Sequence, residues 1–231
     1  MTAIGKKLIF LLLVLLFWNR LSMAEENTIA NSVEKGIYGM DRALDNIQPG
    51  AIEFDEAEDY FDKIIQNCNN VTKEQCANAN YGKGRILNDN KEEYEEAMKY
   101  FDKAFEMNPS CCECLVQKSY SLWKLYRYKD ADVCIDQALK MCPLYAHAWN
   151  NKGLFYLEGS DLPNPNPFVD SAKALEYFNR ATDCDPNFGD AWYNKGLALQ
   201  KLGRTDEAEA AFAKASECDY GVSEQKTGLE G

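Results

Sequence analysis

The chain has 231 residues, of which 46% are hydrophobic and 12% aromatic, so it can bury a core and does not have the composition of a disordered protein. Its 37 acidic residues outnumber its 25 basic residues and give a formal net charge of −12 at pH 7. Nucleic acids and anionic membrane surfaces attract clustered Lys and Arg, and no basic run occurs here. We therefore expect no nucleic-acid partner, and we expect the acidic surface to keep the protein soluble.

Residues 1–24 have the parts of a secretory signal peptide: a basic start at Lys6-Lys7, the eleven-residue apolar run Leu8–Trp18, and a small-residue ending at Ala24. Cleavage before Glu25 removes three basic residues and lowers the formal charge from −12 to −15. The apolar run spans about 16 Å as a helix, about half of the hydrocarbon core of a bilayer. We expect a secreted or extracytoplasmic protein without membrane insertion after cleavage; tethering by an uncleaved N-terminal segment is the alternative.

Residues 29–68 have the pattern of a degenerate helical hairpin. Apolar residues recur every three or four positions from Ile29 to Ile47, as on one face of a helix, and Pro49-Gly50 then breaks the pattern. A second helix is predicted to follow. Its apolar face consists of Ala57, Phe61 and Ile64.

The joint after this hairpin carries the only N-glycosylation acceptor pattern of the chain, Asn70-Val71-Thr72. Such three-residue patterns also arise by chance. Because Asn70 falls in a predicted surface joint of an exported chain, it is a candidate glycosylation site.

The rest of the chain is internally repetitive. A pattern of Ala, a large apolar residue, Ala and Pro recurs after 34 residues, and a long repeat period of this kind indicates stacked structural units. The series runs from Ala97, Phe101, Ala104 and Pro109 to Ala131, Ile135, Ala138 and Pro143. Two near-identical stretches, Ala148–Gly153 and Ala191–Gly196, lie 43 residues apart instead. The nine extra residues fall in a Pro-rich insertion at 159–167.

The repeated residues have a physical reading as packed helix pairs. Small residues such as Ala174 let two helices approach closely, and Phe178 on the same face fills the space between them. Gly153 and Gly196 lie inside helical patterns, so we expect them to allow close helix crossing rather than a turn. Because one such pair cannot bury its apolar face alone, neighbouring pairs must stack.

This pattern resembles the tetratricopeptide repeat (TPR) family, whose unit is a helix–turn–helix of about 34 residues. The resemblance implies an all-α fold: a right-handed α-solenoid, or TPR-like superhelix, of about five stacked antiparallel helix pairs. The repeat over 111–143 departs from the family pattern, with Leu115 and Ser119 where an aromatic residue and Gly are usual. The implied repeats are 76–109, 111–143, 145–186 with the insertion at 159–167, and 189–219, followed by a flexible tail over 220–231.

In this family, certain side chains of the first helices line a concave face, and the resemblance implies a groove for a protein or peptide there. The corresponding residues here are Arg85, Gln117, Tyr120, Trp123, Lys124, Asn150, Asn151, Leu154, Tyr193, Asn194, Gln200 and Lys201. Amides, aromatic rings and a few cations suit an extended peptide backbone. The carboxylate clamp of some family members is not reproduced, because Asp190 stands where a cation is required.

No catalytic site, cofactor or metal site is predicted. The only histidine, His147, has no evident nucleophile beside it, and scattered Asp and Glu are expected on solvated helical faces. The leading hypothesis is a non-catalytic exported scaffold that binds a protein or peptide through the concave face of its repeats.

Nine cysteines in an exported chain indicate disulfides, and most of them lie at the joints between hairpins. In an antiparallel hairpin the start of the first helix lies beside the end of the second. Cys112 or Cys114 can therefore reach Cys142, and Cys68 can pair with Cys76. The connectivity stays open, and the odd count leaves at least one thiol unpaired, through which the chain can form a homo-oligomer.

Two alternative functions rest on the cysteines. The cluster Cys111, Cys112 and Cys114 suggests a thiol- or metal-active protein, although adjacent cysteines fit a tetrahedral zinc site poorly. The unpaired cysteine suggests a self-assembling surface protein.

Overall fold

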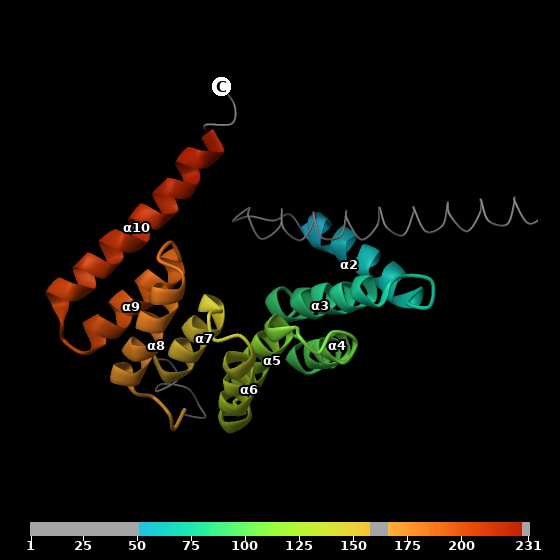
Figure 1. Ribbon diagram of the computed structural model, residues 1–231, viewed down its shortest axis with the longest axis horizontal. Helices are drawn as coiled ribbons and strands as arrows, with labels where there is room; N and C mark the ends of the chain where they lie inside the picture. Colours follow the sequence, from blue (N-terminus) through green and yellow to red (C-terminus); the bar gives the residue numbers. More distant parts are fainter. Residues whose placement is uncertain (1–50, 158–165, 228–231) are drawn as a thin grey trace, which may run out of the picture. The chain divides into compact units, whose positions relative to one another are not determined.

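The computed structural model describes residues 51–157 and 166–227, which form nine α-helices and no β-strand (Figure 1). The all-α prediction is confirmed for this part of the chain. The described residues fall into two compact units, the first ending at Pro109 and the second beginning at Ser110. The predicted signal peptide and the first helix of the 29–68 hairpin lie outside the described residues.

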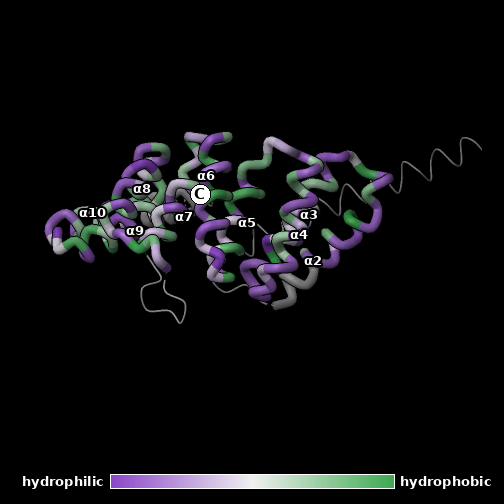
Figure 2. The backbone as a smooth tube through the Cα atoms, turned by 90° about the horizontal axis from the view of Figure 1, so that it is seen from below, coloured by the Kyte–Doolittle hydropathy of each residue, from purple (hydrophilic) through white to green (hydrophobic). Residues whose placement is uncertain are grey.

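The first unit contains α2 (Ala51–Gln66), α3 (Lys73–Asp89) and α4 (Tyr94–Met107). The second unit contains α5 (Cys112–Lys124), α6 (Tyr128–Met141), α7 (Ala146–Leu157), α8 (Ser171–Cys184), α9 (Gly189–Lys201) and α10 (Thr205–Thr227). None of these described helices is both long and apolar enough to cross a bilayer. Hydrophobic and hydrophilic residues instead alternate along each helix (Figure 2), as expected where one face is buried.

In the first unit, α3 packs against both α2 and α4. The predicted apolar face of α2, formed by Ala57, Phe61 and Ile64, is fully buried. Thr72 starts α3 because its hydroxyl accepts from the backbone N–H of Gln75, while the Gln75 side chain accepts from the backbone N–H of Thr72. This capping box places the helix start at Lys73, three residues before the predicted repeat boundary.

In the second unit, three hairpins follow one another: α5 with α6, α7 with α8, and α9 with α10. The hairpins stack through α6 against α7 and α8 against α9. The small residues of the repeat pattern lie at the closest helix contacts, where none of their surface is exposed. They are Ala131, Ala138, Ala174, Ala181, Ala191 and Ala198. Two helices can approach closely here because an alanine projects only one methyl group.

The glycines of the repeat pattern allow this close crossing, as predicted. A Cβ added at Gly153 would lie 2.7 Å from Cδ1 of Phe178, and one added at Gly196 would lie 2.6 Å from Cδ1 of Phe212. Carbon atoms that do not clash stay about 3.5–4.0 Å apart. Each phenylalanine ring therefore occupies the space that a side chain at the glycine would need.

The hairpin of α5 and α6 solves the same packing problem with different residues. Ser119 replaces the glycine and Ile135 replaces the phenylalanine, and both side chains are fully buried. The Ser119 hydroxyl donates to the carbonyl of Val116 at 2.6 Å, so its polar group is satisfied inside its own helix. A slightly larger first residue is thus matched by a smaller second one.

The tryptophans of the duplicated stretch connect each hairpin to the preceding one. The indole N–H of Trp149 donates to the carbonyl of Pro143 at 2.8 Å, and that of Trp192 donates to the carbonyl of Pro186 at 2.9 Å. The last carbonyl groups of a helix have no partner within the helix. Each indole bonds the carbonyl of the proline that follows such an end, Pro143 after α6 and Pro186 after α8.

Three of the four turns inside hairpins use a residue with positive φ. The residues are Glu92 (φ 54°), Tyr126 (φ 60°) and Gly203 (φ 73°). In each case the backbone N–H of the following residue donates to a carbonyl in the last turn of the first helix, at 2.9–3.0 Å. This arrangement ends a helix by a left-handed residue, a position that favours glycine.

The fourth turn contains the Pro-rich insertion, of which only the end is described. Asn166 is buried, its side-chain amide donates to the carbonyl of Phe155, and its oxygen accepts from the backbone N–H of Phe168 at 3.0 Å. Asp170 then caps α8 by accepting from the backbone N–H groups of Ala172 and Lys173. The residues that follow the insertion are therefore held against α7 before α8 begins.

The C-terminal boundary differs from the prediction. A flexible tail is predicted over 220–231, whereas α10 continues to Thr227. This stretch contains no Pro, and its single Gly before residue 228 is insufficient to stop a helix. Residues 228–231 lie outside the described part of the chain.

Candidate functional site

The residues predicted to line a binding groove all lie on the first helices of their hairpins. In the second unit, α5 carries Gln117, Tyr120, Trp123 and Lys124; α7 carries Asn150, Asn151 and Leu154; and α9 carries Tyr193, Asn194, Gln200 and Lys201. Because α7 contacts both α5 and α9, these three helices form one layer. Arg85 belongs to α3 of the first unit, where its Nε donates to Asp89 at 2.7 Å.

Side chains of α7 and α9 meet through a pair of amides. Asn194 Nδ2 donates to Asn150 Oδ1 at 3.0 Å, and Asn150 is buried with 6% of its surface exposed. Lys201 Nζ donates to the carbonyl of Leu157 at 3.2 Å, at the other end of α7. These three predicted groove residues thus join neighbouring hairpins.

Side chains of α5 form an aromatic layer with α7. The Trp123 ring stacks on Phe155, with centroids 5.8 Å apart and ring planes at 12°. Lys124 Nζ lies 5.3 Å from the ring centre of Tyr120 and 5.6 Å from that of Trp123. The indole N–H of Trp123 is buried and has no hydrogen-bond partner among the described residues. Burial of a donor without a partner costs free energy, so the packing of the Trp123 ring must compensate for that cost.

Four residues of this layer, on α7 and α9, are at least partly exposed, and we call them the amide–tyrosine face: Asn151, Leu154, Tyr193 and Gln200. Tyr193 is 52% exposed, and its ring lies 5.4 Å from that of Phe212. Asn151 is partly exposed and Gln200 is exposed. Each amide supplies two N–H donors and a carbonyl acceptor, which match the alternating groups of a peptide backbone.

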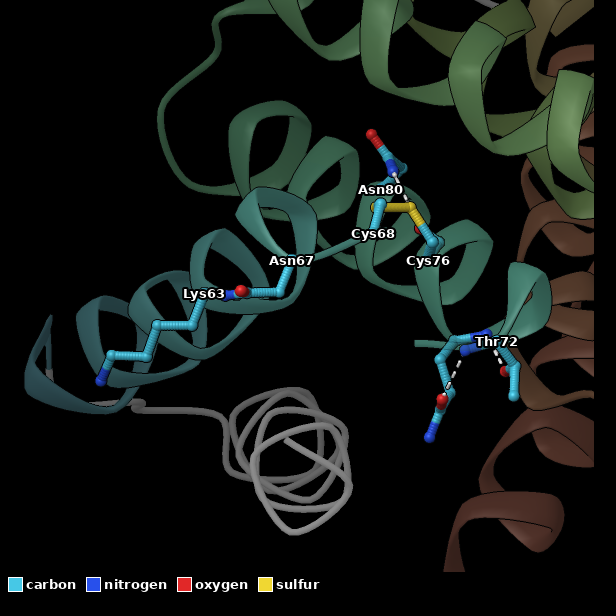
Figure 3. The surroundings of a disulfide bond; sticks show 7 residues. Lys63, Asn67, Cys68, Thr72, Cys76 and Asn80 are labelled. Carbon is cyan, nitrogen blue, oxygen red and sulfur yellow. Dashed lines mark hydrogen bonds between the residues drawn. A yellow bond between two sulfur atoms is a disulfide. The ribbon is translucent and has the colours of Figure 1, made fainter. Parts of the chain in front are cut away.

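The predicted joint cysteines form pairs in the structure. Cys68 and Cys76 are bonded across the turn between α2 and α3, with Cα atoms 5.4 Å apart (Figure 3). Asn80 lies beside the bond and donates from Nδ2 to the carbonyl of Cys76 at 2.8 Å. The capping residue Thr72 lies on the same turn, so the disulfide and the cap together hold the start of α3 (Figure 3).

The second unit contains two further pairs. Cys112 is bonded to Cys142, which joins the start of α5 to the residue after α6, and Cys111 is bonded to Cys114. Of the two partners considered for Cys142, the structure thus has Cys112, while Cys114 takes a neighbour that the sequence did not indicate. All three cysteines of the 111–114 cluster are thus bonded to sulfur in the structure. Of the other three cysteines of the described chain, Cys134 is buried and its Sγ donates to the carbonyl of Leu115 at 3.4 Å, while Cys218 is a buried thiol and Cys184 a partly exposed one.

The candidate glycosylation site lies on the surface. Asn70 is exposed in the turn between α2 and α3, and its backbone N–H donates to the carbonyl of Asn67 at 2.8 Å. The hydroxyl of Thr72, the third residue of the acceptor pattern, accepts the hydrogen bond that caps α3. Its carbohydrate state stays a prediction.

A set of buried lysines was missed by sequence reasoning. Lys83 is 8% exposed and its Nζ lies 2.7 Å from both Glu58 and Asp62, while Lys91 also contacts Glu58 at 2.7 Å. Burial alone would lower the pKa of Lys83, but hydrogen bonds to Asp62 and Glu58 outweigh it and hold the pKa above its usual value.

The hairpin of α7 and α8 has an equivalent lysine. Lys152 is 6% exposed and is ion-paired with Asp136, and its Nζ lies 3.8 Å from Asp132 on α6. Burial opposes the charge of Lys152, yet the two carboxylates raise its pKa above the usual value. A signal was present in the sequence, because a lysine precedes the glycine in Lys83-Gly84, Lys152-Gly153 and Lys195-Gly196.

The described helices therefore form an all-α solenoid of antiparallel helical hairpins, the architecture of helical-repeat proteins. Two models of a family described as "Tetratricopeptide repeat" match residues 77–111 and 177–210. These two stretches of the chain are thus tetratricopeptide repeats.

Two relatives cover different shares of the chain. The chain is 39% identical over 72 residues to the uncharacterized protein MJ0572 of Methanocaldococcus jannaschii. The matched region covers 31% of this chain and 80% of that protein. The chain is 25% identical over 154 residues to the tetratricopeptide repeat-containing protein trd-1 of Caenorhabditis elegans, which covers 67% of this chain but only 18% of that protein. The chain thus spans less than a fifth of the length of trd-1.

A solved structure supports the fold. TTC0263, described as a thermophilic TPR protein of Thermus thermophilus, superimposes with a TM-score of 0.63 at 20% identity. The match covers 82% of this chain and 90% of that chain. At this identity the likeness establishes the architecture alone.

Proposed function

We propose that this protein is an exported, non-catalytic scaffold that binds an extended segment of a partner protein through the amide–tyrosine face. Repeat proteins of this fold act in general by binding other proteins, because stacked hairpins present an extended surface rather than an enclosed reaction site. The observation that supports this particular face is that its side-chain amides are available to hydrogen-bond a partner. The side chains of Asn151 and Gln200 make no hydrogen bond within the described chain, and Tyr193 is half exposed.

The chemistry of the face fits a peptide backbone. Asn151 and Gln200 can each donate to a peptide carbonyl and accept from a peptide N–H, while Leu154 and the Tyr193 ring offer apolar contact to alternate side chains. A tyrosine contributes a large rigid contact at low entropic cost, as it does in antibody binding loops.

The test is a binding experiment with the chain from Glu25 onward. Partners that co-purify with the protein from its source are identified, and one is purified for direct titration. We expect Asn151→Ala/Tyr193→Ala to weaken binding about tenfold or more, since two hydrogen-bonding or apolar contacts are lost. Gln137→Ala, an exposed amide on α6, is the matched control and should leave binding unchanged. Undiminished binding by the double variant would remove the amide–tyrosine face from the proposal.

Export is a separate part of the proposal and rests on residues 1–24. The expected result is a protein recovered outside the cytosol whose first residue is Glu25. Recovery of the full chain in the membrane fraction would support the tethered alternative instead.

Self-assembly through cysteine is the alternative that one observation favours, since Cys184 is an unpaired and partly exposed thiol. Non-reducing mass mapping distinguishes the cases. The scaffold proposal expects the pairs Cys68–Cys76, Cys111–Cys114 and Cys112–Cys142 within one chain. A reducible dimer linked through Cys184 would favour the alternative.

A further inference from the structure

A cavity of about 460 Å³ opens between α8, α9 and α10 in the second unit. Leu175 and Asn179 of α8 form one wall, and Trp192, Lys195 and Leu199 of α9 form another. Lys195 lies two residues after Tyr193, which is about 200° around the helix, so the cavity faces a different side of α9 from the amide–tyrosine face.

Comparison between hairpins explains why the cavity carries a cation. Lys195 corresponds to Lys152, 43 residues earlier, which is paired with Asp132 and Asp136 of the preceding helix. The positions 43 residues after these two acids hold Leu175 and Asn179. The hairpin of α9 and α10 thus keeps the lysine and lacks both of the carboxylates that neutralise its counterpart.

Lys195 has no carboxylate partner in the described chain. Its Nζ lies 4.5 Å from the centre of the Trp192 ring, and this cation–π contact takes the place of an ion pair. Burial lowers the pKa of Lys195, and the more distant Asp183 and Glu207 compensate only in part. A paired lysine has the opposite shift, as Lys152 and Lys83 show. The free energy lost by burying this cation is therefore recoverable by an incoming anion.

The other charges around the cavity are already neutralised. Arg204 is ion-paired with Glu207, and Lys214 with Glu217 at 2.9 Å. Their side chains lie at the rim, where Arg204 and Glu207 are exposed, so the cavity is open to another molecule. In a chain of net charge −12, this is a local site with one unneutralised cation above an apolar wall.

We propose that this cavity binds an Asp or Glu side chain of a partner polypeptide, with the carboxylate on Lys195 and a neighbouring apolar side chain against Leu175 and Leu199. The incoming carboxylate supplies the negative charge that Asp136 supplies beside Lys152. The precedent within the same chain favours a carboxylate over other anions, because this lysine position is neutralised by carboxylates in two other hairpins. The site is additional to the amide–tyrosine face and does not depend on it.

The test starts with a displayed library of random peptides selected on the protein. We expect selected peptides to share an acidic residue next to an apolar one. A synthetic copy of one selected peptide is then compared with a copy in which that Glu is replaced by Gln. The Gln peptide should bind about tenfold more weakly or worse, the loss expected for a charge-assisted hydrogen bond.

Asn179→Asp is the decisive variant, because it is nearly isosteric and restores the acid found at Asp136. We expect it to neutralise Lys195 and weaken the Glu peptide about tenfold, with little effect on the Gln peptide. Lys195→Gln should give the same loss without a new acid. The variant Asn151→Ala/Tyr193→Ala of the amide–tyrosine face should bind the Glu peptide normally. Failure of the proposed function can therefore be told apart from failure of this site.

Three results with the peptides would overturn the proposal. These are peptides without acidic enrichment, equal affinity for the Glu and Gln peptides, or full binding of the Glu peptide by Asn179→Asp. Concentration-dependent self-association that Asn179→Asp abolishes would also overturn it, because the occupant would then be a second copy of this chain.

Discussion

The close crossing of α7 and α8 at Gly153 makes a quantitative prediction. Gly153→Ala adds a methyl group that would lie 2.7 Å from Cδ1 and 2.8 Å from Cζ of Phe178. Phe178 is fully buried, so its ring cannot move aside into solvent. One of the two helices must therefore shift, or the ring must leave its preferred rotamer.

Two effects of opposite sign decide the magnitude. Overpacking a core costs about 1–3 kcal/mol, whereas alanine is preferred over glycine inside a helix by about 1 kcal/mol. The overlap with several ring atoms places Gly153→Ala toward the upper part of the overpacking range. We expect a net loss of about 1–2 kcal/mol in the free energy of unfolding.

A double-mutant cycle tests the reason as well as the size. Phe178→Leu removes the ring and leaves space, which the methyl group of Gly153→Ala then partly fills. We expect the double variant to be more stable than the sum of the single variants by about 1 kcal/mol or more. Urea unfolding followed by circular dichroism provides the free energies. Additive effects, or a stabilised Gly153→Ala, would show that the ring and the glycine do not compete for space.

The remaining predictions concern the turns and the ion pairs of the repeats. Gly203→Ala should lower the free energy of unfolding by about 1 kcal/mol, because φ is 73° while an added Cβ meets no atom within 4 Å. Glu92→Gly should raise it by about 0.5–1 kcal/mol, since Glu92 has φ 54°; urea unfolding that gives both variants the same sign contradicts this account. Glu58→Gln should lower it by about 1–2 kcal/mol at neutral pH by removing the carboxylate shared by Lys83 and Lys91. Burial opposes the charge of Glu58, but the two lysines lower its pKa below the ordinary value of 4.5, so its contribution is complete above that pH and is lost as the pH falls through the lowered pKa. The gap between wild type and Glu58→Gln should therefore close in urea titrations at low pH, and a constant gap would refute the assignment.

Sequence periodicity predicted the hairpins well because their packing is local and repeated. The spacing of Ala174 and Phe178 recurs with the helical period, so the buried face can be located without a structure. Gly153 was correctly assigned to helix crossing, since it lies within a helical pattern and a turn was not needed there. The same reasoning found the departure at Ser119 but could not show that Ile135 compensates for it.

The site was less predictable because the state of a polar group depends on its neighbours. Family positions select Asn150 and Asn151 equally, yet Asn150 is buried against Asn194 while Asn151 is accessible. That Lys195 has no carboxylate partner could not be predicted without knowing that α8 packs against α9. The pairing of Cys111 with Cys114 likewise depends on the backbone at the start of α5, which spacing alone does not determine.

The bond between Cys112 and Cys142 has a mechanical consequence. It joins two residues 30 positions apart at the base of one hairpin, so tension applied to the chain ends passes through sulfur and bypasses α5 and α6. This bond by itself therefore shortens the fully stretched chain by about 100 Å, since each residue of extended chain spans about 3.4 Å. In single-molecule pulling, unfolding of this hairpin would therefore add almost no length to the chain unless the bond is reduced.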